Sequence, residues 1–375
     1  MDTSTHTSPR NEPLDAIKAF AIICVVLGHC IQYGSGHTYL AINSFYDNLL
    51  FKAIYSFHMP LFMLLSGYFF GYSVKKRAWY DSIITKIKYL IIPILSWSFI
   101  RTLLLCFFSY RESSTIPGLN YGFQVYSQSA LTEYWFLWAV FYCSALVAIV
   151  HHFLNDSPIV YCLLFVISFI LPDVRNFGLY FYKFMYPFFI IGYFYSTRHL
   201  SIISQITKRR IIVISLVLAY FVLLALYNRD SFIYTTGHTI LKNGSISLKQ
   251  LSIDLYRIII GLCGSIIAIF TIMAIYPSFT SSIKWIASYL GRNTLGIYII
   301  QGFIVVYMSS RLTAISGFSV LRAFLECIVV LFISILVLES IKKSKLLSMV
   351  FLGTRSKSSS STAPSPPSGT DERSN

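Results

Sequence analysis

The strongest constraint on this chain is a series of about ten apolar segments, most of them long enough to cross a lipid bilayer. Hydrophobic residues make up 55% of the sequence and charged residues only 12%, about half the charged share of soluble domains. The sequence therefore predicts an all-α, polytopic integral membrane protein. The expected spans are 14–33, 50–72, 88–109, 134–153, 158–172, 177–196, 210–227, 253–276, 286–308 and 319–341, of which the fifth is short enough to be re-entrant instead.

The distribution of positive charge predicts how the helices are oriented. The net charge is +15, but the basic residues lie in short loops between apolar segments, where charge sets orientation, so nucleic-acid binding is not indicated. With the N-terminus placed in the cytoplasm, the inner loops carry 14 Lys and Arg residues and the outer loops 6. An even number of spans places both termini on one side of the membrane, and the charge bias predicts that this side is the cytoplasm.

The chain is expected to hold one membrane domain between two terminal segments. We expect residues 1–13 to form a cytoplasmic N-terminal segment, 14–345 the transmembrane domain, and 346–375 a disordered cytoplasmic tail that ends in a Ser- and Pro-rich stretch. The longest outer loops, 110–133 and 228–252, are rich in Ser, Gly, Asn and Tyr. That composition suits either contact with a sugar or a plain solvated linker.

The first apolar segment, LDAIKAFAIICVVLGH from Leu14 to His29, carries three polar groups: Asp15, Lys18 and His29. Ten residues separate Lys18 from His29, so both lie within about 20° of the same helix face, on the order of 16 Å apart along the axis. Ionisable groups in a membrane helix are costly and are functional candidates by default. His29, which can carry a proton near neutral pH, is therefore the leading candidate for a catalytic residue.

The second apolar segment contains FHMPLFMLLSGYFF and a second candidate, His58. On adjacent antiparallel helices, His29 and His58 would both lie in the outer half of the membrane. Pro60 interrupts the hydrogen bonding of the helix beside His58, and Ser66-Gly67 allows another backbone to approach closely. These features predict a polar cavity, with the alternative that His58 only hydrogen-bonds a neighbouring carbonyl.

Basic residues cluster around the start of the third apolar segment. Such a cluster at the inner surface can hold the phosphates of an anionic cofactor, or it can be charge that only sets topology. The residues are Lys75, Lys76, Arg77, Lys86 and Lys88.

Three further positions are candidates for binding or support. Arg101 lies inside an apolar segment and needs a partner, either Glu133 or a bound ligand. Trp135, in the aromatic run 134–138, fits an interfacial aromatic belt or stacking against a sugar ring. Asn293 is placed to cap the start of the ninth segment. No spacing of Cys, His or carboxylate residues indicates a metal site.

Four motifs stand out within residues 12–345: LDAIKAFAIICVVLGH, FHMPLFMLLSGYFF, YWFLWAVFY and LGRNTLGIYIIQ. Together they resemble the membrane-bound acyltransferase-3 family, in particular its fucose 4-O-acetylase and O-antigen O-acetyltransferase branch. They occur in the family's order, and their combination is specific.

The resemblance also assigns functional positions. In the last motif this chain has Gln301 where the family often has histidine, so this position cannot act as an acid or base here. The residues that match family positions are Lys18 and His29, then Ser66, Gly67 and Tyr68, and more loosely Lys86 and Lys88.

The resemblance implies an acetyl-CoA-dependent O-acetyltransferase of the bacterial inner membrane, without a metal. The acceptor would be a sugar hydroxyl of a surface polysaccharide, such as the O-antigen of lipopolysaccharide, or its lipid-linked precursor. His29 could act as base or as nucleophile, with His58 beside it. We expect Lys18, Lys86, Lys88 and Arg101 at the donor, supported by Asp15, Ser66, Gly67, Trp135 and Asn293. The alternative is a transporter or flippase for a glycan or anionic solute, with His29 and Arg101 as a proton or anion relay.

Overall fold

The computed structural model describes residues 11–35, 44–115, 117–173, 179–198, 210–242, 244–316 and 318–354. In this part of the chain the fold is helical apart from one hairpin of two short strands, as the sequence predicts. In chain order the elements are α1 (Glu12–Gly34), η1 (Ser44–Asp47), α2 (Leu49–Val74), α3 (Trp79–Lys86), η2 (Ile87–Ile91), α4 (Ile92–Ser113), α5 (Leu119–Gln128), η3 (Ser129–Glu133), α6 (Trp135–Phe153), α7 (Pro158–Ile170), α8 (Leu179–Thr197), α10 (Arg210–Leu226), η5 (Arg229–Ser231), α11 (Ile233–Thr236), β1 (Leu241–Lys242), β2 (Ser245–Ile246), α12 (Leu248–Ile275), η6 (Tyr276–Ser278), α13 (Ser281–Arg292), α14 (Thr294–Ser316), α15 (Val320–Lys342) and α16 (Lys345–Leu352).

Every one of the apolar segments expected to span the membrane contains a helix. Among the described residues, 6 helical segments are long and apolar enough to cross a bilayer. The third of them is continuous from Trp79 to Ser113, because α3, η2 and α4 follow one another without a break. The six are Glu12–Gly34, Leu49–Val74, Trp79–Ser113, Trp135–Phe153, Leu248–Ser278 and Val320–Lys342. The full count of about ten spans and the sides of the termini stay predictions.

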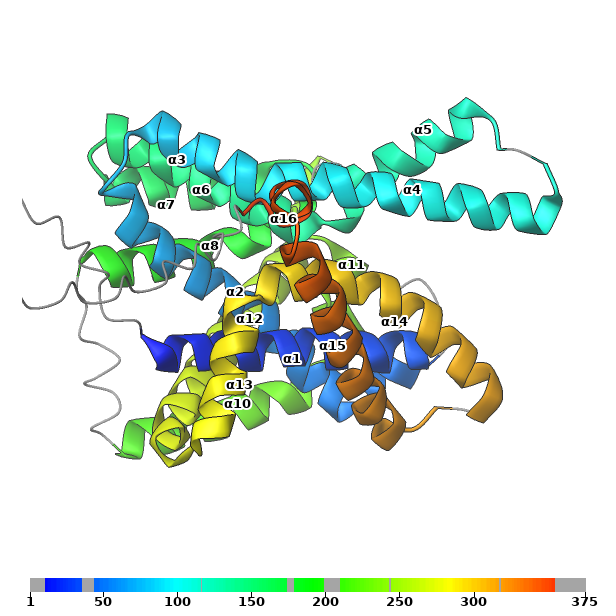
Figure 1. Ribbon diagram of the computed structural model, residues 1–375. Coiled ribbons are helices and arrows are strands. Elements are labelled where there is room, and N and C mark those ends of the chain that lie inside the picture. The colour runs from blue at the N-terminus through cyan, green and yellow to red at the C-terminus, as the bar shows by residue number, and fades with distance from the viewer. Residues whose placement is uncertain are drawn as a thin grey trace, which may run out of the picture.

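Helix α1 runs through the middle of the molecule (Figure 1). It packs against α2, α12, α13, α14 and α15. Its most apolar stretch is 72% buried inside the protein, compared with 28% for α15 at the periphery. Asn11 caps its first turn by accepting a hydrogen bond from the backbone of Leu14, and Pro13 occupies the first turn, where its missing N–H costs nothing. The helix that carries Lys18 and His29 is therefore the one most enclosed by others.

Helices α2 and α8 approach each other closely at two glycines. A Cβ atom on Gly67 would lie 2.0 Å from the carbonyl oxygen of Phe189, and one on Gly192 would lie 2.0 Å from that of Leu64. Only glycine fits either position, because any side chain would push the two backbones apart. The predicted close approach at Ser66-Gly67 is thus confirmed, with α8 as the partner.

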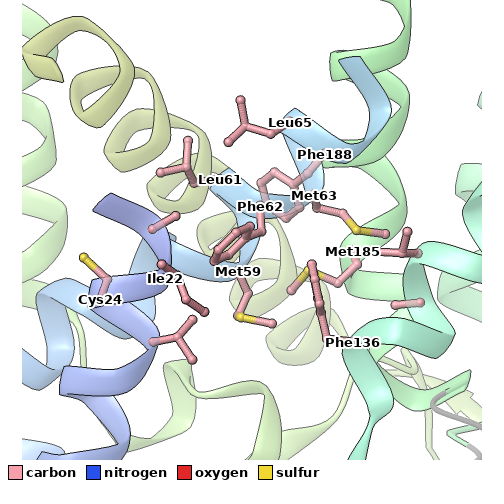
Figure 2. Close-up of a cluster of buried hydrophobic side chains, with 14 of the residues drawn as sticks. Ile22, Cys24, Met59, Leu61, Phe62, Met63, Leu65, Phe136, Met185 and Phe188 are labelled. Atoms are coloured by element: carbon pink, nitrogen blue, oxygen red, sulfur yellow. The ribbon is translucent and has the colours of Figure 1, made fainter. Parts of the chain in front are cut away.

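Large apolar side chains from α1, α2, α6 and α8 fill the centre of this packing (Figure 2). Ile22 faces Met59 and Phe62, and Phe136 lies beside Met185. Flexible methionines suit such a junction, because they fill irregular gaps between helices that cross at different angles. The core fixes the mutual register of the helices that carry the candidate site.

The two segments expected to be long outer loops contain regular secondary structure. Segment 110–133 contains the end of α4, α5 and η3, and the α4–α5 hairpin projects from the rest of the molecule (Figure 1). Segment 228–252 contains η5, α11 and the β1–β2 hairpin, in which Leu241 pairs with Ile246. Both segments therefore have structure of their own, beyond that of a plain linker.

The first part of segment 346–375, which was expected to be a disordered tail, is helical. Helix α16 occupies Lys345–Leu352, and the indole nitrogen of Trp97 on α4 donates a hydrogen bond to the carbonyl of Phe351 at 2.9 Å. Leu352, the last residue of this helix, is buried. The apolar residues of this short helix explain the difference, because they gain burial when the helix packs against α4, α14 and α15. Residues 1–10 and 355–375 lie outside the described residues.

Candidate functional site

His29 is held by a side chain from the other end of the chain. Its Nδ1 atom lies 3.1 Å from Oε1 and 2.9 Å from Nε2 of Gln301 on α14. The amide nitrogen of Gln301 also donates a hydrogen bond to the carbonyl of Tyr298 at 3.1 Å. Because an amide carries both a donor and an acceptor, Gln301 can hold the imidazole in either tautomer. His29 is only half-buried, so the ring is fixed without being sealed off.

His58 lies near His29, but its side chain is bonded to the backbone of its own helix. It is buried, and its Nδ1 atom lies 2.7 Å from the carbonyl oxygen of Ile54, one turn earlier in α2. Tyr55 packs edge-on against His58 at 4.8 Å between ring centroids, and its hydroxyl donates to Oε1 of Gln32 at 2.9 Å. The structure thus shows the neighbouring-carbonyl bond that the sequence offered as the alternative for His58.

The guanidinium of Arg101 forms an ion pair with a carboxylate. Its Nε atom lies 2.7 Å from Oε2 of Glu133, to which the hydroxyl of Ser129 also donates a hydrogen bond at 3.2 Å. Of the two partners considered for Arg101, Glu133 is therefore present. Tyr33 of α1 lies within electrostatic range of both charges, and its ring centroid is 6.2 Å from that of His29. The ion pair thus lies on the same side of the molecule as His29.

A cavity of about 210 Å³ lies between α1, α2, α3, α6 and α14. The ammonium of Lys18 borders it, 2.6 Å from Oδ1 of buried Asp15 and 4.8 Å from the ring centroid of Phe69. The polar lining residues are Lys18, Ser66, Lys86, Thr294 and Tyr298, and the apolar ones are Phe62, Leu65, Phe69, Leu90, Phe136, Leu137, Val140 and Leu295.

Tyr298 connects this cavity with the histidine. It lines the cavity, and its carbonyl accepts the hydrogen bond from Gln301 that orients the amide toward His29. Lys18 and His29 lie eleven residues apart on α1, so the cavity and the imidazole are on the order of 16 Å apart along that helix. The cavity with its two lysines is therefore linked to His29 through Tyr298 and Gln301.

Four of the expected site residues lie elsewhere. Lys88 is exposed and does not line the cavity, because it lies about half a helical turn from Lys86. The ring of Trp135 packs against Phe181 of α8 in a tilted arrangement, with 4.2 Å between ring centroids. Asn293 separates α13 from α14 and donates its side-chain hydrogen bond to the carbonyl of Tyr289. Gly67 belongs to the contact between α2 and α8.

Sequence reasoning did not single out a buried polar network on α12. Arg257 and Asp254 are fully buried there, 2.8 Å apart, and Arg257 also donates to the backbone carbonyls of Ser231 and Gly237. Burial lowers the pKa of His238, which lies 3.4 Å from the same aspartate. The available signal was an acidic and a basic residue three positions apart in an apolar segment. These bonds anchor segment 228–240 to α12, which is a structural task.

Comparison with known proteins identifies the family of the chain. The family described as the acyltransferase domain matches residues 11–339. The nodulation protein NolL of Sinorhizobium fredii (strain NBRC 101917 / NGR234) is 27% identical over 308 residues, covering 80% of this chain and 79% of the relative. The protein of the same name from Mesorhizobium japonicum (strain LMG 29417 / CECT 9101 / MAFF 303099) is 25% identical over 305 residues, covering 79% and 77%. No solved structure shows a significant match. Since the family match runs through nearly the whole helical domain, the chain belongs to the acyltransferase-3 family of membrane proteins.

Proposed function

We propose that this protein transfers the acetyl group of acetyl-CoA to a hydroxyl of a sugar. The acceptor would belong to a surface polysaccharide, such as O-antigen, or to its lipid-linked precursor. The observation that carries the proposal is the run from Lys18 and Lys86, through Tyr298 and Gln301, to His29. This run supports the proposal because it links two cations, suited to the donor, with one potential base.

The donor is proposed to enter at the lysine end of this path. Acetyl-CoA carries phosphates at one end of a long, flexible pantetheine arm and the thioester at the other. Lys18 and Lys86 would bind phosphate oxygens, since charge-assisted hydrogen bonds to anions are strong. The cavity is too small for the whole donor and suits a section of the arm, with Phe62, Phe69 and Phe136 as its apolar wall.

His29 is proposed to act as the general base. Its Nε2 atom takes the proton from the sugar hydroxyl while the hydroxyl oxygen attacks the thioester carbonyl. The carbon–sulfur bond then breaks, coenzyme A leaves as a thiolate, and the proton held by His29 returns to that sulfur. General base catalysis of this kind contributes about 10²–10⁴ in rate.

Gln301 is proposed to keep the imidazole ready for this step. With Oε1 accepting from Nδ1–H, the lone pair of His29 lies on Nε2, and the same bond persists once the ring is protonated. A neutral amide cannot take up the proton itself. Gln301 is therefore a positioning residue in this scheme.

The membrane arrangement belongs to the same proposal. Both termini and the 75–88 loop would lie in the cytoplasm of a bacterium, where acetyl-CoA is made, and His29 in the outer half of the inner membrane. The positive-inside bias of the loops supports this orientation. The acceptor would then approach from the outer side, near Arg101 and Glu133.

A transporter or flippase is the second candidate, and membership of an acyltransferase family counts against it. The charge of Arg101 is already balanced by Glu133, which weakens its use as an anion relay. The deciding experiment compares surface glycans by mass spectrometry from cells with and without the protein. The proposal requires O-acetyl groups that disappear with the protein, and unchanged glycan acetylation would overturn it.

A further inference from the structure

A second cavity, of about 350 Å³, lies between the end of α2, the start of α3 and the end of α6. It is within the size range of small-molecule sites. It shares no lining residue with the cavity at Lys18, and Trp79 on its wall lies seven residues, or about 10 Å along a helix, from Lys86. Its lining residues are Val74, Lys75, Arg77, Ala78, Trp79, Ala148, His151 and His152.

The polar lining of this cavity is basic. Lys75 donates to the carbonyl oxygen of Thr197 at 3.1 Å, and Arg77 donates to the hydroxyl of Thr85 at 3.1 Å. Both partners are neutral, and in the part of the chain that the structure describes neither cation forms an ion pair with a carboxylate. Among the described residues, the cavity therefore carries two cations without a paired carboxylate.

The imidazole of His151 is oriented by a carboxylate outside the cavity. Its Nδ1 atom lies 2.6 Å from Oδ2 of Asp156, which also accepts hydrogen bonds from the hydroxyls of Tyr161 at 2.9 Å and Tyr193 at 2.8 Å. Asp156 does not line the cavity. The carboxylate fixes the ring through Nδ1 and leaves Nε2 as the nitrogen available to a ligand, as in other carboxylate–histidine pairs.

The N-terminus of α3 also opens at this cavity. Ala78 is its N-cap residue and has no side chain that could accept a hydrogen bond from the first turn. The free N–H groups there carry partial positive charge and favour an anion. Asp81, in the same turn, is exposed and lies outside the lining. Cations, imidazoles and helix N–H groups thus border the same cavity.

We propose that this cavity binds the phosphate groups of an anionic ligand. Phosphate offers several oxygens to Lys75, Arg77 and His151 at once, and charge-assisted bonds to it are the strong ones. The same chemistry is available from two sources: the nucleotide end of the acyl donor, or the headgroup of an anionic phospholipid. The proposal that the cavity binds phosphate does not depend on acetyl transfer. Only the identification of the phosphate as part of the acyl donor rests on the proposed function.

The test measures binding directly, apart from activity. Purified full-length protein in nanodiscs of neutral phosphatidylcholine is titrated with adenosine 3′,5′-bisphosphate by calorimetry. A second set of nanodiscs contains phosphatidylglycerol, and the thermal unfolding of the protein is compared between the two lipids. The nucleotide source predicts saturable binding of the bisphosphate, and the lipid source predicts stabilisation by phosphatidylglycerol instead.

The variants K75Q and R77Q test whether the lining cations bind phosphate, and K76Q is their matched control. Lys76 has the same charge in the same loop but does not line the cavity. Each lining substitution should weaken binding, or the lipid-dependent stabilisation, about tenfold or more, because a hydrogen bond to a charged group is lost. K76Q should stay close to wild type, and R77K should recover part of the loss.

Three results would overturn the site. Binding of neither probe would do so, as would equal losses in K76Q and R77Q, which would show only diffuse surface charge. A third is unchanged binding in both K75Q and R77Q. Thermal unfolding without any probe identifies a variant that fails to fold, and R77K then replaces R77Q in the comparison. Because acetylation is not the readout, failure of the proposed function would leave this test intact.

Discussion

His29 and Gln301 are 272 positions apart in the chain, yet the imidazole Nδ1 of one lies 3.1 Å from the amide oxygen of the other. The contact joins the central helix α1 to α14, next to the carbonyl of Tyr298. It fixes one ring nitrogen of His29, as the proposed role of general base at the other nitrogen requires.

Replacement of His29 should abolish acetyl transfer while the protein still inserts. H29A and H29Q both remove the proposed base, so the rate should fall by about 10²–10⁴. The measurement is O-acetyl content of the glycan per unit of membrane-inserted protein. H58A serves as the comparison, because His58 is bound to the carbonyl of Ile54 and should have a milder effect. Near-normal acetylation by H29A would remove the central residue of the mechanism.

Replacement of Gln301 should slow turnover without weakening donor binding. Q301L removes the hydrogen bond that orients the ring of His29, so kcat should fall roughly tenfold or more. The KM for acetyl-CoA should stay near the wild-type value, because Gln301 does not line the cavity at Lys18. Q301H should retain more activity than Q301L, since imidazole can also bond to His29. An equal loss in both variants would argue against a positioning role.

Neutralising the lysines of the cavity should raise the KM for acetyl-CoA. K18Q and K86Q each remove a proposed phosphate contact, so KM should rise about tenfold or more in each variant with a smaller change in kcat. K88Q is the matched control, because Lys88 is exposed outside the cavity, two residues from Lys86. Steady-state kinetics at varied acetyl-CoA concentration separate the two parameters. If K88Q raises KM as much as K86Q does, the lysines act only through general surface charge.

Alanine at Gly67 should destabilise the packing of α2 against α8. Its Cβ atom would lie 2.0 Å from the carbonyl oxygen of Phe189, so the helices must separate, at a cost of roughly 1–3 kcal/mol. Thermal unfolding of the detergent-solubilised protein should show a clearly lower midpoint. G122A is the control, because a Cβ on Gly122 would meet only the sulfur of Cys106, at 3.9 Å. Equal stability of G67A and wild type would contradict the packing.

Both termini should lie in the cytoplasm. Fused after Thr354, beyond α16, a reporter that works only in the cytoplasm should be active, and one that works only in the periplasm should be inactive. We expect this because the inner loops carry most of the basic residues. Fusions in the 75–78 loop should behave alike, and fusions near residue 115 should give the opposite result. Activity of a periplasm-specific reporter at the C-terminus would invert the proposed topology.

The sequence alone determined the helical class of this protein and the place of Lys18 and His29 on one helix face. Apolar runs of bilayer length must form helices, since every backbone polar group in lipid must be bonded within its own segment. The period of the helix then fixes which residues share a face, whatever surrounds it. The motifs were likewise visible in the sequence, and the family match over residues 11–339 confirms them.

Only the tertiary structure decided which side chains meet across helices. Gln301 was known as a departure from the family's motif, but its bond to His29 depends on how α14 is placed against α1. The same holds for the choice of Glu133 as partner of Arg101 and for Lys86, in place of Lys88, at the cavity. These outcomes rest on register and rotation between helices. Register and rotation are set by close contacts such as Gly67 against Phe189, which no pattern within a single segment contains.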